Sequence, residues 1–316
     1  MNATEEYDVV IVGGGAAGLS AALLLGRARR RVAVVDAGRP RNERATHVHG
    51  YLTRDGVSPA RLLDRAREEV AGYGVELIQG TAEKVRADRS VILEDGRVLT
   101  ARQVILASGL RDVLPDVEGA DERWGRDFFQ CPYCHGWELR DRVLAVLGTA
   151  GSSVQQALLV RQFSDNVTLF THDMEDLDED ARSSLGALGV KVVAGRVEAL
   201  VSGRDSLSSV RLDNGELHPC EALFYEPAAT VDASIVELAD CSTSENGCLS
   251  TDEHGRTGVD GVWAVGNAAD PAAQVIVAAG DAYRVAVAVN AELIVDDVAR
   301  AKAGSAAGDV LLPESK

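Results

Sequence analysis

Aromatic residues and positive charge are scarce in this chain of 316 residues. Phe, Trp and Tyr make up 4% of it, and 32 Lys and Arg stand against 49 Asp and Glu, for a formal net charge of −17. Surfaces that bind single-stranded nucleic acid use aromatic stacking, and nucleic-acid binding in general uses Lys and Arg to neutralise phosphates. We therefore expect no nucleic-acid partner.

Cysteines and long apolar runs are also few. Five Cys do not make a disulfide scaffold. No uninterrupted apolar stretch reaches the roughly 18 residues of a membrane span. The first apolar run, residues 9–12, follows acidic residues and ends in glycines, which is not the pattern of a secretory signal. We expect a cytoplasmic protein with no membrane partner, and the length suggests about two domains.

A glycine-rich turn near the start joins a short apolar run to an Ala/Leu-rich stretch that favours a helix. Gly13, Gly15 and Gly18 form a GxGxxG fingerprint, and a second apolar run ends at Asp36. In such a β-α-β unit the first glycine permits a tight turn, the second admits a pyrophosphate and the third allows close packing of helix on strand. An acid at the end of the second strand binds a ribose hydroxyl. The pattern predicts a dinucleotide-binding domain.

The same plan returns from Arg142. Gly148 and Thr171 are spaced as Gly13 and Asp36 are, and the segments 75–85 and 190–200 also correspond. In both copies a Gly-containing hairpin turn follows. The sequence therefore predicts a duplicated dinucleotide-binding fold. A third strand-like segment, 258–267, leads into a helical stretch from Gln274 to about Val298 that should return to the first domain, and residues 301–316 should form a loose tail.

The second copy departs from the first where a nucleotide would bind. Ala150 and Ser153 replace the second and third glycines, and no acid stands at Thr171. A site for NADPH would need arginines there to bind the 2′-phosphate. The chain instead has six carboxylates, which would repel that phosphate: Asp173, Glu175, Asp176, Asp178, Glu179 and Asp180. We expect the second nucleotide site to be degenerate, with an acidic, solvated helix start as the ordinary alternative.

The strongest chemical signal is the segment CPYCHGWE at 131–138. Cys131 and Cys134 can close a small disulfide, and a helix that begins at Pro132 would lower the pKa of a thiol. A zinc site would need two further ligands, and the remaining cysteines are scattered. A glutaredoxin-like CPYC module would lie early in a small single domain. We favour redox chemistry, expect no metal, and interpret Cys220, Cys241 and Cys248 as incidental.

His135 directly follows the second cysteine of this pair. An imidazole with an ordinary pKa of about 6.5 can accept and donate a proton near neutrality. We therefore expect His135 to act as acid and base in thiol–disulfide exchange.

Taken together, GGGAAG, an ASG near residue 108, a central CxxC and a late GVWAVGN resemble the low-molecular-weight thioredoxin reductases along essentially the whole chain. CPYCHG followed by WE, without phosphate-binding arginines, is most similar to the dithiol oxidase branch of the gliotoxin and holomycin enzymes, and above all to the holomycin type. Thioredoxin reductases usually have Asp at His135, and Asp at Asn267 beside the flavin ribityl chain. Because Asn also hydrogen-bonds hydroxyls, we still expect FAD to bind.

The resemblance implies an α/β protein with two Rossmann-like domains, the second inserted in the first. The FAD domain would comprise residues 1–116 and 247–316, and a central domain at 117–246 would carry the disulfide. Ala82 or Glu83 would lie near adenine, and Gln274 and Val275 at the pyrimidine edge of the flavin. The residues expected to bind FAD are Gly13, Gly15, Ala16, Ala17, Gly18, Asp36, Ala37, Gly38, Arg41, His47, His49, Ala82, Ala107, Gly109, Gly266, Asn267, Gln274 and Val275.

The resulting hypothesis is FAD-dependent oxidation of a small-molecule dithiol, in the biosynthesis of a disulfide antibiotic or in protection against one. A substrate thiolate would attack Cys131, Cys134 would pass electrons to FAD, and dioxygen would become hydrogen peroxide. A homodimer is implied by the resemblance alone. The alternatives are a disulfide or thioredoxin reductase supplied by NAD(P)H or ferredoxin, and a non-catalytic flavin-binding redox sensor.

Overall fold

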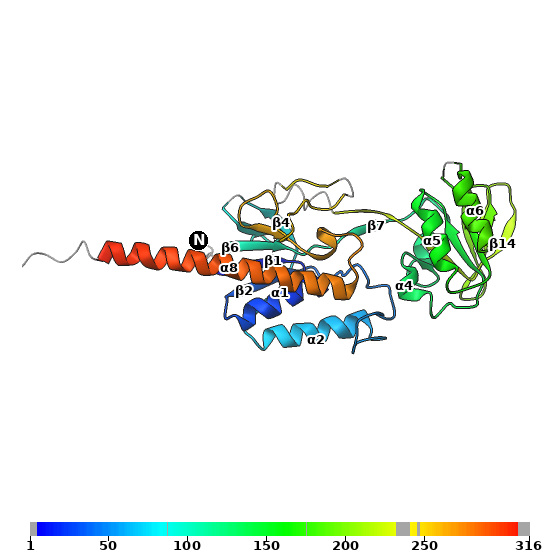
Figure 1. Ribbon diagram of the computed structural model, residues 1–316. Helices are drawn as coiled ribbons and strands as arrows, with labels where there is room; N and C mark the ends of the chain where they lie inside the picture. Colours follow the sequence, from blue (N-terminus) through cyan, green and yellow to red (C-terminus); the bar gives the residue numbers. More distant parts are fainter. Residues whose placement is uncertain (1–4, 87, 175, 232–240, 245–246, 309–316) are drawn as a thin grey trace, which may run out of the picture. The chain divides into compact units, whose positions relative to one another are not determined.

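A seven-stranded sheet is the centre of the first of two units in the computed structural model, which describes residues 5–86, 88–174, 176–231, 241–244 and 247–308 (Figure 1). This unit comprises Met1–Pro40, Arg61–Arg111 and Thr230–Lys316, and the second comprises Arg41–Ala60 and Asp112–Ala229. Since the second unit interrupts the first, the predicted fold class of two Rossmann-like domains, one inserted in the other, is confirmed.

The first unit has parallel strands in the order β3-β2-β1-β6, with β17 also paired to β6 and an antiparallel β5-β4 beyond it. Near-continuous apolar runs such as that of β1 suit parallel strands covered on both faces. The strands are β1 (Glu5–Val12), β2 (Val32–Asp36), β3 (Glu76–Gln79), β4 (Ala82–Val85), β5 (Ser90–Leu93), β6 (Val98–Leu106) and β17 (Val262–Ala264).

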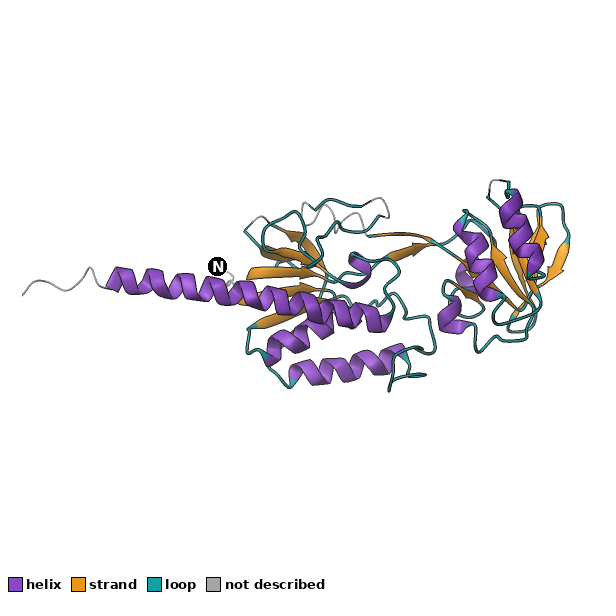
Figure 2. Ribbon diagram, in the orientation of Figure 1, coloured by secondary structure: helices purple, strands orange, loops and turns teal. Residues whose placement is uncertain are grey.

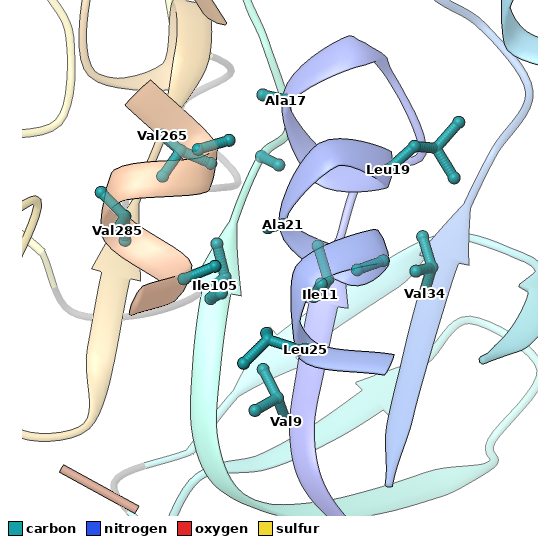
Figure 3. Close-up of a cluster of buried hydrophobic side chains, with 14 of the residues drawn as sticks. Val9, Ile11, Ala17, Leu19, Ala21, Leu25, Val34, Ile105, Val265 and Val285 are labelled. Atoms are coloured by element: carbon teal, nitrogen blue, oxygen red, sulfur yellow. The ribbon is translucent and has the colours of Figure 1, made fainter. Parts of the chain in front are cut away.

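Helices α1 (Ala16–Arg27), α2 (Pro59–Ala71) and α8 (Val275–Gly308) pack against this sheet, and η1 (Gly266–Ala268) follows β17 (Figure 2). Side chains of α1 meet those of β1, β2 and β6, and Val285 of α8 belongs to the same cluster (Figure 3). Leu25 and Ile11 in this cluster are fully buried. The core therefore fixes the start of α1 against the ends of β1 and β2, where the glycine turn lies.

The predicted loose tail is wrong for residues 301–308, because α8 continues to Gly308. Alanine has the highest helix propensity, and extending an existing helix requires no new nucleation. Residues 309–316 lie outside the described part of the chain.

The second unit repeats the arrangement. Its parallel sheet has the order β11-β10-β9-β15-β8, and an antiparallel sheet β12-β13-β14 lies beside it. Its strands are β8 (Phe128–Phe129), β9 (Leu144–Leu147), β10 (Val167–Phe170), β11 (Lys191–Val193), β12 (Val197–Ser202), β13 (Leu207–Leu212), β14 (Leu217–Pro219) and β15 (Ala222–Tyr225), and its helices are α3 (Ala120–Arg123), α4 (Pro132–His135), α5 (Ser152–Val160) and α6 (Glu179–Ala187).

The order β11-β10-β9-β15 in the second unit matches β3-β2-β1-β6 in the first. The predicted hairpin turns occur in both copies, with Gly96 and Gly215 at positive φ. The chain passes between the units through β7 (Arg111–Val113) and β16 (Ala228–Thr230), which pair with each other. The predicted duplication is thus visible in the strand order of both units.

Candidate functional sites

At two positions of the glycine turn in the first unit, backbone atoms lie too close to admit any other residue. Gly13 has a φ of +107°, and a Cβ there would overlap the backbone of Ala107. A Cβ at Gly18 would overlap the carbonyl oxygen of Gly13. These contacts bring the start of α1 against the turn and the end of β6, as the fingerprint requires.

Gly15 differs from Gly13 and Gly18 because, among the described residues, no atom lies within 4 Å of where its Cβ would stand. It is the N-cap of α1 with extended backbone and no side-chain cap. The first N–H groups of α1, which include those of Ala16 and Ala17, have no partner within the helix. Open space before unpaired N–H groups at a helix N-terminus suits a pyrophosphate.

Asp36 at the end of β2 faces the same turn. A Cβ at Gly14 would overlap its carboxylate, and the N–H of Gly38 donates to Oδ1 at 3.2 Å. Nη2 of Arg67 on α2 lies 3.3 Å from Oδ2. The carboxylate is therefore held in place next to the glycine turn, with Ala37 between it and Gly38. No sequence motif predicts the contact of Arg67 with Asp36, because only the packing of α2 brings the two residues together.

The ASG segment after β6 lines the other side of this turn. Ala107 is buried, its N–H donates to the Val12 carbonyl at 2.8 Å, and Gly109 has a φ of +74°. The Oγ of Ser108 is buried and has no hydrogen-bond partner in the described structure. Since a buried hydroxyl without a partner is costly, this atom fits a site built around a polar ligand.

The contacts of Asn267 account for one departure from the family pattern, the Asn in place of the usual Asp. Its amide nitrogen donates to three carbonyl oxygens of the loop before α8, those of Asp270 at 3.0 Å, Pro271 at 3.3 Å and Ala273 at 3.0 Å. A carboxylate cannot make these donations. Asn267 therefore organises the loop that leads to α8, and its carbonyl oxygen remains an acceptor suited to hydroxyl groups.

The other predicted cofactor residues of the first unit lie at element boundaries. Gly266 has a φ of +62°, and a Cβ there would overlap that of Ala17 on α1. Val275 is the first residue of α8, and Gln274 precedes it. Ala82 begins β4, shortly after Gly80, whose N–H donates to the Asp36 carbonyl at 3.0 Å. This unit thus gathers the predicted residues, apart from three treated below, around the glycine turn or at the ends of neighbouring elements.

In the second copy, a serine side chain at the glycine turn accepts hydrogen bonds from backbone N–H groups of the same turn. Ser153 Oγ accepts from the N–H groups of Thr149 at 3.1 Å and Ala150 at 3.4 Å. A Cβ at Gly148 would overlap the Met174 side chain. The N–H groups that would bind a pyrophosphate are therefore partly occupied, which supports the prediction of a degenerate site.

Arg196 is a basic residue that the sequence pattern did not place near this turn. Its guanidinium pairs with Asp173, and the Asp173 carboxylate lies 3.2 Å from Nε2 of His172. Burial lowers the pKa of His172 below its ordinary value. Asp173 thus neutralises an arginine that could otherwise pair with a 2′-phosphate.

Part of the acidic stretch has a structural role. Asp178 caps α6 by accepting from the Ala181 N–H at 2.7 Å, and Glu179 and Asp180 occupy the first turn. Carboxylates there interact favourably with the helix dipole. The helix-start alternative is confirmed for these three acids, whereas Glu175 lies outside the described residues.

Cys131 and Cys134 are joined in a disulfide across the start of α4. Cys131 is the N-cap and Pro132 the first helical residue, as the sequence predicts. Gln130, just before the pair, accepts at Oε1 from Arg41 Nη2 at 2.9 Å. Arg41 also forms a bidentate pair with Asp112, with an Nε–Oδ2 distance of 3.0 Å, so it helps hold the segment that leads into the disulfide.

The His135 ring stacks on Phe129, with centroids 4.1 Å apart. Burial lowers the pKa of His135 to about 4, the charge of Glu138 opposes this shift, and the charges of His49 and His47 add to it. The sequence-based expectation of an ordinary pKa is therefore wrong, because desolvation dominates. At neutral pH this imidazole is uncharged and can accept a proton.

His47 and His49 belong to the same unit as the disulfide. Their rings lie 5.9 Å apart, and Nε2 of His49 is 3.6 Å from the Glu138 carboxylate. The structure therefore places both histidines and Arg41 in the redox unit. Their predicted contact with FAD stays a prediction.

Two aromatic side chains of the redox segment face solvent. Tyr133 is 75% exposed and Trp137 is 65% exposed, and the Arg140 guanidinium lies 4.5 Å from the Trp137 ring centroid. The cysteines outside the pair, Cys220, Cys241 and Cys248, are buried. Burial raises the pKa of Cys220 far above its ordinary value, which suits an unreactive thiol.

The described residues contain no group of three or more His, Cys, Asp and Glu side chains that could hold a metal ion. In the same part of the chain, no helix has the length and apolarity to cross a membrane.

Comparison with known proteins identifies the family to which this architecture belongs. The family model for pyridine nucleotide-disulphide oxidoreductases matches residues 7–290. The thioredoxin reductase sirT of Leptosphaeria maculans is 30% identical over 93% of this chain and 96% of its own length. A probable thioredoxin reductase of Arthroderma benhamiae is 34% identical over 55% of this chain, but the match spans 46% of that protein.

Among solved structures, the crystal structure of HlmI superposes with a TM-score of 0.91 at 43% identity, over 98% of this chain and 99% of that chain. The predicted relation to thioredoxin reductases is confirmed by these matches. The chain belongs to the pyridine nucleotide-disulphide oxidoreductase family and is a thioredoxin reductase-like oxidoreductase.

Proposed function

We propose that the protein is an FAD-dependent dithiol oxidase that converts a small-molecule dithiol to an intramolecular disulfide, with dioxygen as electron acceptor. The observation that carries this proposal is a contrast within one unit. The Cys131–Cys134 disulfide is intact, whereas Ser153 accepts hydrogen bonds from two N–H groups, those of Thr149 and Ala150, in the turn that would bind a nicotinamide nucleotide. This contrast favours an enzyme that takes its electrons from the dithiol itself.

The first unit fits FAD. Gly15 leaves room for a pyrophosphate, Asp36 suits a ribose, and the Asn267 carbonyl oxygen suits a ribityl hydroxyl. Domain limits of 1–116 with 247–316 for the FAD domain, and of 117–246 for the central domain, belong to this proposal. The division by contacts differs in three places: residues 41–60 and 112–116 belong to the central unit, and the first unit resumes at Thr230. FAD would supply the two-electron chemistry that links the reduced cysteine pair to dioxygen, giving hydrogen peroxide.

The thiol–disulfide steps use the chain's own residues. A substrate thiolate attacks the sulfur of Cys131, the Cys131–Cys134 bond breaks, and Cys134 leaves as a thiolate. The second substrate thiolate then attacks the substrate sulfur of the mixed disulfide and releases Cys131. The dithiol loses two electrons and the enzyme disulfide gains them. The exposed rings of Tyr133 and Trp137 next to the pair suit a small apolar substrate.

His135 accepts the proton of the attacking thiol in this scheme. Because its pKa is lowered to about 4, it is already neutral over the physiological range and becomes protonated only as the pH falls through about 4. Single-turnover rates with a dithiol, corrected for ionisation of the substrate thiol, should therefore show no inflection near pH 6.5 and should decline toward pH 4.

The variant His135→Gln should lower this rate by about 10²-fold and remove the acidic decline. Circular dichroism and thermal unfolding control for the lost stacking on Phe129. An unchanged rate in a folded His135→Gln protein would assign proton transfer to another group.

We also propose a biological setting and an oligomeric state. The resemblance to dithiol oxidases suggests biosynthesis of a disulfide antibiotic, or protection against one, in the cytoplasm. A homodimer is consistent with exposed apolar side chains along α8, among them Val287, Ile294 and Val295, each at least 50% exposed.

A disulfide reductase supplied by NAD(P)H or ferredoxin is the second candidate. The presence of Arg196 beside the second glycine turn favours it, since an arginine there can bind a 2′-phosphate. Its pairing with Asp173 weighs against it. Rapid reduction of the flavin by a pyridine nucleotide would indicate the reductase and not the oxidase.

A further inference from the structure

Gln130, the residue before Cys131, is held by hydrogen bonds at its side chain and at its main chain. Its Oε1 accepts from Nη2 of Arg41 at 2.9 Å. Its main-chain carbonyl accepts from Nε2 of Gln156 on α5, also at 2.9 Å. That carbonyl belongs to the peptide group that joins Gln130 to Cys131, so Gln156 contacts the backbone directly before the first redox cysteine.

The groups that hold Gln130 are themselves anchored in the second unit. Arg41 forms its bidentate pair with Asp112, and the two side chains are only 17% and 10% exposed. Helix α5 packs Val154 and Ala157 into the core of the same unit. Strand β8, which leads into Gln130, is paired with β15 in the parallel sheet. The contacts at Gln130 therefore tie the redox segment to rigid parts of the fold.

Gln156 makes its contact with Gln130 in an unfavourable setting. The Oε1 of Gln156 is buried and has no hydrogen-bond partner among the described residues. A buried acceptor without a partner opposes folding, and turning the amide over would only bring Oε1 against the Gln130 carbonyl oxygen. The unpaired acceptor offsets much of what the hydrogen bond contributes to stability. A purely structural role is therefore a poor explanation for Gln156.

The segment after the cysteine pair is also fixed in position. The N–H of Gly136 donates to the Pro132 carbonyl at 2.7 Å, and a Cβ at Gly136 would overlap the ring of Phe163. When the disulfide opens, the backbone on both sides of the pair is thus restrained. Restraint keeps the two sulfurs close and reduces the entropy lost when the bond closes again.

We propose that Gln156 and Arg41 are positioning residues that act through Gln130 to hold Cys131 beside Cys134 and so favour the disulfide over the open dithiol. This inference rests on the proposed redox role of the pair and adds two residues to it. CxxC pairs of the same spacing differ widely in reduction potential, so their surroundings decide how easily they are reduced. A pair that closes readily returns to the form that a substrate thiolate can attack.

The experiment equilibrates the purified flavoprotein anaerobically with mixtures of reduced and oxidised glutathione. Two glutathione thiols give up two electrons and two protons to the cysteine pair and become glutathione disulfide. Free thiols are then alkylated, and the tryptic peptide 127–140, which contains both cysteines, is quantified by mass. The fraction of open pair gives the equilibrium constant between dithiol and disulfide.

Two substitutions at Gln156 remove the hydrogen bond in different ways. Gln156→Glu keeps the size of the side chain, but an ionised carboxylate cannot donate. Gln156→Leu removes the donor together with the unpaired acceptor, so its melting temperature should stay near that of the unmodified protein. Both should shift the equilibrium toward the open dithiol by about tenfold, which raises the reduction potential by about 30 mV.

Gln130→Met tests the other contact, because it removes the acceptor for Arg41 and leaves the pair of Arg41 with Asp112 in place. The main-chain carbonyl at this position is still held by Gln156. The equilibrium should therefore shift in the same direction by a smaller factor.

Gln155→Leu is the matched control, since Gln155 precedes Gln156 on α5 and its side chain is exposed. This substitution should leave the equilibrium unchanged. An unchanged equilibrium in folded Gln156→Leu, or an equal shift in Gln155→Leu, would overturn the positioning role and leave the dithiol oxidase proposal standing. A disulfide that neither glutathione nor dithiothreitol opens in the unmodified protein would instead overturn the proposed function.

Discussion

Replacing Cys134 by serine should reduce oxygen-coupled dithiol oxidation at least about 10³-fold, as expected when a group essential to the reaction is lost. The variant cannot form the Cys131–Cys134 disulfide, so a substrate thiolate has no sulfur–sulfur bond to attack. The remaining Cys131 thiol should instead react with a disulfide reagent to give a stable adduct, because no second cysteine resolves it. Oxygen consumption measures the first effect and intact-protein mass measures the second.

Cys220→Ser provides the matched control. Cys220 is fully buried and its thiol donates to the Ala222 carbonyl at 3.2 Å, a bond that a serine hydroxyl can replace. This variant should keep its activity. Full dithiol oxidation by Cys134→Ser would exclude the cysteine pair as the electron carrier.

Gly15→Val should have the second largest effect, by removing the cofactor without unfolding the protein. Gly15 has φ −78° and ψ −169°, a conformation that valine adopts readily, and no described atom lies within 4 Å of its Cβ position. The side chain would fill the space that a pyrophosphate needs. We expect the flavin content of the purified protein to fall to about a tenth or less, with a normal far-ultraviolet circular dichroism spectrum.

The duplicated fold supplies the control for this variant. Gly151 begins α5 in the second copy as its N-cap, and it too has open space around its Cβ position among the described residues. Gly151→Val should leave both flavin content and dithiol oxidation unchanged, since this turn is not expected to hold a nucleotide. Loss of flavin from Gly151→Val alone would reverse the roles assigned to the two units.

The sequence contained most of the fold because its signals are local. The GxGxxG turn, the apolar runs around it and the Gly-containing hairpins each predict an element, and their repetition predicts the matching strand orders of the two units. Pro132 at the first position of α4 likewise marks a helix start. The end of α8 was missed because an Ala/Gly/Ser-rich composition suits both a tail and the extension of a helix.

The electrostatics of the site depend on contacts between distant parts of the chain, which no local pattern contains. Arg67 meets Asp36, Arg196 meets Asp173, and His49 meets Glu138 only once the chain is folded. The lowered pKa of His135 has the same origin, because it comes from burial. Sequence motifs therefore identified the redox pair, while its proton-transfer environment required the structure.

An anaerobic titration of the purified yellow protein tests the central proposal most directly. NADPH is added first and a small dithiol second, while the flavin absorbance is followed, and air is admitted at the end. We predict that NADPH leaves the absorbance essentially unchanged, that the dithiol bleaches it, and that oxygen restores it with formation of hydrogen peroxide. Rapid bleaching by NADPH, with a dithiol without effect, would contradict the account and identify a reductase.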